Sequence, residues 1–274
     1  MIESGLLYGM VLSLVALGVM IPFRLLNFPD LTAEGAYPLG GALTAALLIH
    51  HVPPMLAIVL ATLAGGLLGV GTAYLHLRFR LNTLLSGIIL STMIYSVNLR
   101  LMGKPNVPLF DVAHLFSGDL LALLALNAAL FALGYLLLNT HKGLRFRAVG
   151  LNPHCAEKLG VPLARYILCG LFIGNALSAL AGSLIVQVQH YGDIGMGFGI
   201  VIHALAALMV GESLIGNQTL LKQVLAPLIG ALIYQQIQGL ALSLGLAPTD
   251  LKFITGGIVL LAISFKQFGQ RQYA

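Results

Sequence analysis

The chain has 274 residues, of which 58% are hydrophobic and only 8% are charged. Soluble domains carry roughly 25% charged residues and about 45–50% apolar ones. Fourteen Lys and Arg residues and nine acidic residues cannot cover a water-exposed surface on a chain of this length, whose mean hydropathy is +0.96. The composition excludes a soluble globular domain. It predicts an all-α integral membrane protein, because a helix in hydrocarbon satisfies its own backbone hydrogen bonds.

Apolar runs separated by polar residues, proline and glycine predict about nine membrane-spanning helices, since about 20 residues cross the hydrocarbon core. The second and seventh runs are short, and each follows a segment rich in helix-breaking residues, near 27–35 and 187–198. This arrangement leaves no room for a soluble domain. The predicted spans are 4–23, 33–50, 54–75, 83–101, 119–139, 165–186, 198–213, 221–244 and 251–266.

The Lys and Arg residues are distributed unequally between alternate loops. Because cytoplasmic loops carry an excess of these residues, the richer set of loops is expected to be cytoplasmic, with the N-terminus outside and the C-terminus inside. The net charge of +5 is therefore interpreted as membrane orientation and not as nucleic-acid binding. The richer set contains Arg24, Arg78, Arg80, Lys142, Arg145, Arg147, Lys158, Arg165, Lys222, Lys266 and Arg271. The poorer set contains Arg100, Lys104 and Lys252.

The sequence contains no recognisable catalytic or cofactor motif. Residues 211–218 have two glycines in the spacing of a nucleotide-binding loop but lack the Lys-Ser/Thr that contacts phosphate and magnesium. No His-Glu-x-x-His, Gly-x-Ser-x-Gly or Cys-x-x-Cys motif is present, and two cysteines cannot form a zinc cluster alone. We expect a protein that is not an enzyme and binds no cofactor or metal itself.

The longest basic loop, His141 to Pro162, contains a predicted short helix in its second half. Asn152 is a suitable N-cap, Pro153 suits the first helical position, and Gly160 closes the helix. Such a helix could dock into a groove on a cytoplasmic partner. The alternative is an ordinary positively charged cytoplasmic loop.

The segment 27–35 combines helix breakers with acidic residues that would be costly against lipid. Asp30 and Glu34 could line a transport pathway, as in transporters with interrupted helices. Alternatively, Asp30 or Thr32 caps the second span.

The segment 187–197 is loosely similar, with an Asp, several helix breakers and then a short apolar run, which suggests an internal repeat. In the eighth span a glutamine cluster that includes Gln235 either bridges helices or lines a pathway. The candidate pathway residues are Asn27, Asp30, Thr32, Glu34, Gln187, Asp193, Met196 and Gln235.

Four stretches resemble the permease subunits of the branched-chain amino acid class of ABC importers, and most closely the group labelled tryptophan/tyrosine-type permeases. The resemblance covers nearly the whole chain, with the motifs in the same order. The stretches are NFPDLTAEGAYPLGGAL (27–43), GLRFRAVGLNP (143–153), GDIGMGFGIVIHALAALMVGE (192–212) and GLAPTDLKFITGGIVLLA (245–262).

The resemblance implies a single permease domain over residues 1–274, in the bacterial inner membrane, that translocates a small solute such as an amino acid. It implies a second permease copy, with a homodimer expected. It also implies ATPase subunits that use ATP and Mg on the cytoplasmic side, and a solute-binding (lipo)protein outside. The alternative is an ion-coupled secondary transporter, which would require carboxylates in the middle of spans.

The resemblance also implies that the loop around residues 152–160 is the coupling helix that lodges in the ATPase. Apolar and cap contacts are expected to carry the docking, with charged residues at its rim. The implied coupling residues are Asn152, Pro153, Ala156, Glu157, Leu159, Gly160 and, from a second motif, Glu212.

Overall fold

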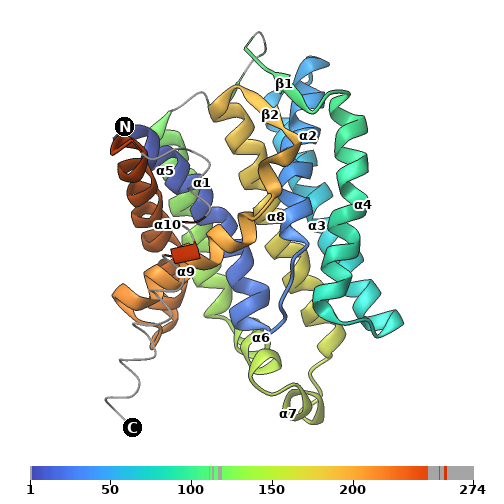
Figure 1. Cartoon of the computed structure of the whole chain (residues 1–274). Helices are drawn as coiled ribbons and strands as arrows, with labels where there is room; N and C mark the ends of the chain where they lie inside the picture. The colour runs from blue at the N-terminus through green and yellow to red at the C-terminus, as the bar shows by residue number, and fades with distance from the viewer. Residues whose placement is uncertain are drawn as a thin grey trace.

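The computed structural model describes residues 2–245 except 111, 113, 117 and 118, together with 253, 256 and 257. Figure 1 shows a bundle of helices with a small two-stranded ribbon at one end. The elements are α1 (Ile2–Met20), η1 (Ile21–Leu25), α2 (Ala33–Ile49), α3 (Pro54–Phe79), α4 (Thr83–Met102), β1 (Asn106–Pro108), α5 (Leu120–Leu138), α6 (His141–Leu151), α7 (Pro153–Lys158), α8 (Leu163–Gln189), β2 (Tyr191–Asp193), η2 (Ile194–Gly197), α9 (Ile200–Ile215) and α10 (Leu220–Ser243).

Eight apolar helices coincide with the first eight predicted spans. Six of them are long and apolar enough to cross a membrane, and α2 and α9 are shorter. At 1.5 Å per residue, α2 and α9 extend about 25 Å, less than the ~30 Å hydrocarbon core. The structure describes three positions of the predicted ninth span, 251–266, and the rest of that span lies outside the described residues. The predicted inside C-terminus also lies outside them.

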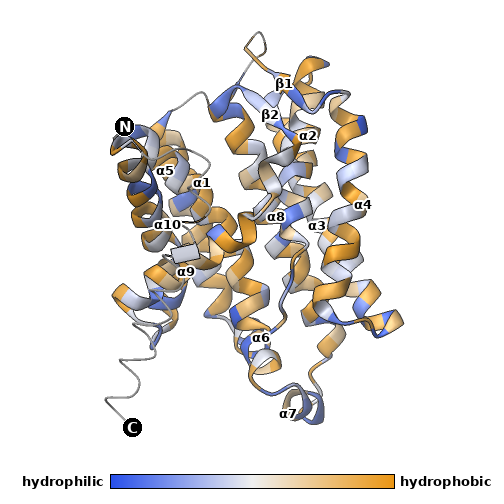
Figure 2. Ribbon diagram, viewed as in Figure 1, coloured by the Kyte–Doolittle hydropathy of each residue, from blue (hydrophilic) through white to orange (hydrophobic). Residues whose placement is uncertain are grey.

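The bundle has a buried centre and an apolar periphery. Most of α1 and α8 is buried, whereas little of α4 and α5 is. Figure 2 shows hydrophobic residues along the helices and hydrophilic ones gathered near their ends, notably around α7. This distribution is that of a protein whose outer surface faces lipid and whose ends face water.

The contacts support the internal repeat that the two helix-breaking segments suggest. Figure 1 shows α1 and α8 running in opposite directions through the centre, and the two helices pack against each other. Each is followed by an irregular segment and then a short helix. Helix α3 packs on α8 as α10 packs on α1, and α2 packs on α3 and α8 as α9 packs on α10 and α1. Exchanging α1–α3 with α8–α10 therefore preserves the contacts, as in an inverted repeat.

The two irregular segments share a local hydrogen bond as well as a position. An Asp carboxylate in each accepts from the backbone N–H two residues later: Asp30 from Thr32 at 2.9 Å, and Asp193 from Gly195 at 2.6 Å. The first segment is extended and rises beside the helices before α2 begins (Figure 1). It is not a plain turn at the membrane surface.

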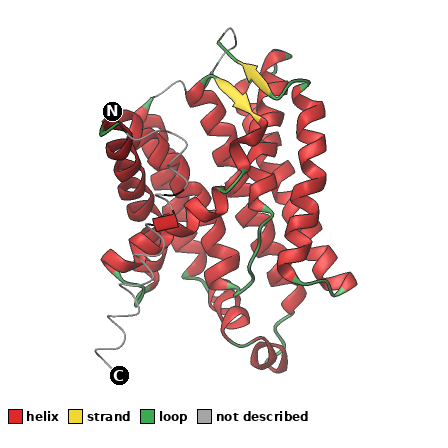
Figure 3. Cartoon of the chain, viewed as in Figure 1, coloured by secondary structure: helices red, strands yellow, loops and turns green. Residues whose placement is uncertain are grey.

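The two-stranded ribbon was not expected from the sequence. Strands β1 and β2 pair antiparallel, with Asn106 opposite Asp193, and are the yellow arrows in Figure 3. Among the described residues, this ribbon is the one departure from the expected all-α fold. Strands of three residues are too short to show an alternating pattern, and their partners come from distant parts of the chain.

Candidate functional site

The basic loop between α5 and α8 forms two helices instead of the one expected. Thr140 caps α6 by accepting from the backbone N–H of Gly143 at 3.2 Å. Asn152 caps α7 by accepting from Cys155 at 3.0 Å, with Pro153 at the first helical position. Gly160 follows in the left-handed conformation, at φ +77°. The predicted α7 is confirmed, while α6 escaped prediction because its composition is not apolar.

The surface of this loop differs from the expected one at a single residue. The Ala156 side chain is 1% exposed and packs in the hydrophobic core, so it lies on the buried face of α7. It is therefore not available as a contact surface, which corrects its expected role in docking. Leu151, the last residue of α6, and Leu159, the C-cap of α7, are 88% and 75% exposed. The other expected residues of the loop, Asn152, Pro153, Glu157 and Gly160, are exposed.

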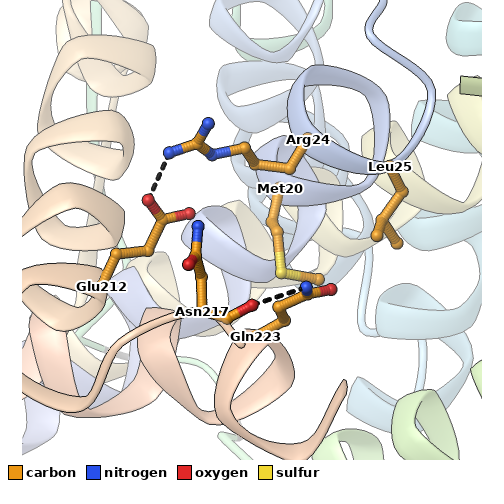
Figure 4. A pocket seen from close by; sticks show the side chains of 6 residues that line it. All are labelled: Met20, Arg24, Leu25, Glu212, Asn217 and Gln223. Atoms are coloured by element: carbon orange, nitrogen blue, oxygen red, sulfur yellow. Dashed lines mark hydrogen bonds and ion pairs between the residues drawn. The ribbon is translucent and has the colours of Figure 1, made fainter. Parts of the chain in front are cut away.

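Glu212, the other expected coupling residue, forms a contact that is separate from the loop that carries α7. It comes from α9 and forms an ion pair with Arg24 of η1. The Glu212 side chain is 5% exposed and that of Arg24 is 41% exposed. Figure 4 shows the two side chains pointing toward each other at the edge of a cavity of about 170 Å³. The cavity is lined by Met20, Arg24, Leu25, Glu212, Asn217 and Gln223.

A second polar group is buried where the extended segment meets α3 and α8. Asp30 is 2% exposed, and its Oδ2 accepts from Asn175 Nδ2 at 2.8 Å. Its Oδ1 accepts from the Thr32 backbone N–H and hydroxyl, and Thr32 Oγ1 lies 2.6 Å from Thr72 Oγ1. The expected pathway residues Asp30 and Thr32 are thus brought together. In this structure their contacts tie the segment to the helices.

A third contact joins the two predicted helix-breaking segments. A Cβ added to Gly197 would lie 2.3 Å from the carbonyl oxygen of Glu34, and one added to Gly41 would lie 2.1 Å from Met196 Cε. The backbone N–H of Gly199 lies beside the half-buried Glu34 carboxylate. Glu34 and Met196, which are far apart in the sequence, are therefore close in space, where η2 packs on α2.

The remaining pathway candidates are dispersed. Gln187 is fully buried and accepts from the Leu115 backbone N–H at 3.0 Å. Asn27 is exposed with a positive φ of 52°, Asp193 stands in the ribbon, and Gln235 is half-buried on α10. These four do not form one site with Asp30.

Three polar residues that take part in these contacts, and a fourth buried polar residue that does not, were not singled out by the sequence analysis as site residues. Thr72 and Asn175 complete the Asp30 group, and Arg24 completes the Glu212 pair. Asn98 of α4 is fully buried, and its amide has no hydrogen-bond partner among the described residues. An amide in an otherwise apolar run is the signal that could have identified Asn98 and Asn175, because such groups rarely face lipid.

The contacts of the described residues can bind a ligand or hold helices together. Among them no group of three or more His, Cys, Asp or Glu residues is placed to hold a metal ion. The polar groups join helices that come from both halves of the repeat.

Comparison with known proteins identifies relatives along almost the whole chain. It is 37% identical to a tyrosine transport system permease protein of Clostridioides difficile, over 94% of this chain and 89% of the relative. It is 25% identical to a probable branched-chain amino acid transport permease protein of Methanocaldococcus jannaschii, over 77% and 73%. A ribose import permease protein of Haemophilus influenzae is 29% identical over 74% and 66%. No solved structure is significantly similar to this chain.

The family comparison covers more of the chain than any single motif. A model described as "branched-chain amino acid transport system / permease component" matches residues 1–264. Its members are multi-pass inner-membrane permeases of ABC transporters, in keeping with the six helices here that are long and apolar enough to span a membrane. The chain therefore belongs to the branched-chain amino acid transport system permease family.

Proposed function

We propose that residues 1–274 form one permease domain that moves a small solute, such as an amino acid, into the cell. The energy comes from separate ATPase subunits, which use ATP and Mg, because the sequence lacks a nucleotide-binding loop. The observation that carries the proposal is the capped helix α7, which projects, with an exposed leucine on each side of it in the chain, from one end of a chain of this family. Family membership also favours this function over an ion-coupled secondary transporter.

The ATPase is proposed to dock at the end that carries α6 and α7. A short helix transmits displacement because its hydrogen-bonded backbone resists bending. Leu151 and Leu159 supply apolar contacts, and Glu157 and Lys158 stand beside them as charges that set orientation. Glu212 takes part through its contact with η1, on which α6 packs.

This end is proposed to be cytoplasmic, with about nine spans and the N-terminus outside. The support is the position of the basic residues. Helices α6 and α7 and the C-terminal end of α3, where Arg78 and Arg80 stand, lie at the end opposite the N-terminus and the ribbon (Figure 1). A solute-binding protein would then meet the ribbon end, and a second permease copy would complete the translocation pathway.

The test of function is reconstitution with the cognate ATPase and solute-binding protein in liposomes. Uptake should require ATP and all three components, and the purified chain alone should neither bind nor hydrolyse ATP. ATP turnover by this chain without another subunit would contradict the proposal.

The test of orientation is cysteine labelling in intact cells, with Cys155 and Cys169 replaced by serine. An impermeant thiol reagent should label Lys104→Cys, near the ribbon, and should not label Arg145→Cys in α6. Labelling of both positions from outside would contradict the proposed topology.

A further inference from the structure

An apolar groove lies between α3 and α8. Its volume is about 330 Å³, and it is lined by Val70, Leu168, Cys169, Phe172 and Ile173. Cys169 is exposed and Ile173 is 40% exposed, so the groove opens on the outer surface of the bundle. At about 30 Å³ for a water-sized group such as a methylene, the groove has room for on the order of ten methylene groups. This is a large part of one lipid acyl chain.

The groove lies near the same end of both helices, because α3 and α8 run antiparallel. Gly65 of α3 packs against Ala179 of α8. Farther along α3, Gly69 packs against Leu171, which comes earlier in α8. The lining residues of α8, within 168–173, lie roughly 8–15 Å from its first residue, at 1.5 Å per residue. That first residue is at the end of the bundle that carries α7 (Figure 1). The groove therefore lies at the depth of the acyl chains of one leaflet, about half of the ~30 Å core.

Two arginines extend the faces that line the groove, toward the end with α7. On α8, Arg165 precedes Leu168 and Cys169 by three and four residues, the spacing of neighbours on one helix face. On α3, Arg78 follows Val70 by eight residues, which is about two turns. Both arginines are exposed, and neither forms an ion pair with a described residue. Neither α3 nor α8 contains an acidic residue, so these two charges have no counter-ion on their own helices.

Tyr74 stands between the groove and the arginine on α3 and is 57% exposed. Tyrosine is enriched where membrane helices leave the hydrocarbon, because its ring is apolar and its hydroxyl is polar. Along α3 the order is therefore apolar groove, interfacial tyrosine and then cation. A phospholipid has the same order of acyl chain, glycerol region and phosphate.

The occupant of this face has to fill the groove and also compensate the two arginines. A free phosphate ion would pair with the arginines and leave the groove unfilled. A phospholipid without net charge would fill the groove and leave the positive charge uncompensated. A second copy of this chain, packed symmetrically on the same face, would bring two more arginines and no acidic residue from α3 or α8, and like charges brought together disfavour binding.

We propose that the groove binds an anionic phospholipid, with one acyl chain between α3 and α8 and the phosphate between Arg78 and Arg165. Arginine binds phosphate oxygens through two parallel hydrogen bonds, and its long apolar stem lets the charge reach the headgroups. In the orientation proposed above, this lipid belongs to the cytoplasmic leaflet, where basic residues at helix ends attract anionic lipids. The bound lipid joins α3, from the first half of the repeat, to α8, from the second.

The test uses the full-length permease in a mild detergent, with Cys155→Ser so that Cys169, in the groove wall, is its one cysteine. The rate of modification of Cys169 by a methanethiosulfonate reagent is measured with added dioleoyl phosphatidylglycerol or dioleoyl phosphatidylcholine. The two lipids have the same chains and differ in net charge, and glycerol 3-phosphate supplies a phosphate without chains. At equal mole fraction, phosphatidylglycerol should slow modification several-fold more than phosphatidylcholine, and glycerol 3-phosphate should have little effect.

Variants then assign the preference to the two arginines. Arg78→Gln and Arg165→Gln should each reduce the preference for phosphatidylglycerol, whereas Lys222→Gln, which removes an exposed charge from α10, should preserve it. Native mass spectrometry of the permease with an equal mixture of the two lipids measures the same preference without using the cysteine. Both comparisons of lipids on the Cys155→Ser protein need no arginine variant, so they remain decisive if those variants fold poorly.

Three outcomes would overturn the proposal. Equal protection by the two phospholipids would show that the arginines do not select the headgroup. Equal protection by glycerol 3-phosphate would show a site for soluble phosphate. Protection that needs no added lipid and increases with permease concentration would show that a second copy covers the groove. Neither ATPase nor solute enters these measurements, so each of these outcomes leaves the proposed transport function standing.

Discussion

Gly18 of α1 and Gly174 of α8 approach each other reciprocally at the crossing of the two central helices. A Cβ added to Gly18 would lie 2.5 Å from the carbonyl oxygen of Gly174, and one added to Gly174 would lie 2.6 Å from the carbonyl oxygen of Gly18. Because α1 and α8 are the equivalent helices of the repeat, each glycine occupies the place of the other. Small residues permit this close backbone contact, as they do between helices in membranes generally.

Replacement of either glycine by alanine should destabilise the protein. Alanine favours a helix over glycine by about 1 kcal/mol, but here its methyl group would collide with backbone, and such overpacking costs roughly 1–3 kcal/mol. We expect Gly18→Ala and Gly174→Ala to lower the melting temperature of the permease in nanodiscs. Gly134→Ala is the matched control, because no atom of the described residues lies within 4 Å of its added Cβ. Equal melting temperatures for all three variants would contradict the close crossing.

The Asp30 group should contribute to stability and not only to transport. In Asp30→Asn the side chain keeps one acceptor oxygen in place of two, so it cannot accept from both the Thr32 N–H and Asn175 Nδ2 in their present orientations. An unsatisfied buried donor costs about 1–3 kcal/mol, and we expect a lower melting temperature together with reduced uptake. Asp119→Asn, at an exposed Asp that makes no capping hydrogen bond, is the control. Reduced uptake at unchanged stability would instead favour a role in the pathway.

The two exposed leucines that flank α7 in the chain, Leu151 and Leu159, should control binding of the ATPase. Leu151→Asp and Leu159→Asp place a charge in the proposed apolar contact, and loss of one interface anchor costs about 2 kcal/mol or more. Assembly should weaken roughly thirtyfold, which co-purification of the ATPase and solute-stimulated ATP hydrolysis both measure. Lys158→Ala, at the rim, should have a much smaller effect. If both leucine variants co-purify normally, α7 is not the docking element.

The ribbon predicts a specific cross-link. Asn106 and Asp193 stand opposite each other on β1 and β2, and side chains directly opposite on antiparallel strands have Cβ atoms about 4.5–5.5 Å apart. In a protein without its native cysteines, Asn106→Cys combined with Asp193→Cys should form a disulfide under mild oxidation, detected by mass spectrometry. The pair Asn106→Cys with Tyr191→Cys, two positions out of register, should cross-link far less. Equal cross-linking of the two pairs would contradict the register.

The sequence by itself determined the protein class, the helix positions and the cap of α7. Lipid and water differ so strongly as solvents that hydrophobicity alone marks the eight helices that coincide with predicted spans. The N-cap at Asn152 could also be predicted from the sequence, because a cap involves only residues that are close together in the chain. The two helix-breaking segments could be located from the sequence as well, because proline and glycine interrupt a helix at their own positions.

Only the tertiary structure decided which polar groups meet. Arg24 and Glu212 are separated by 188 residues, and Asp30 and Asn175 by 145. No local pattern records such pairings, because they depend on how elements far apart in the sequence pack together. Burial of Ala156 and pairing of β1 with β2 depend in the same way on neighbours far along the chain. Hydrophobicity identifies the eight apolar helices as membrane helices, while packing between helices brings their polar side chains together.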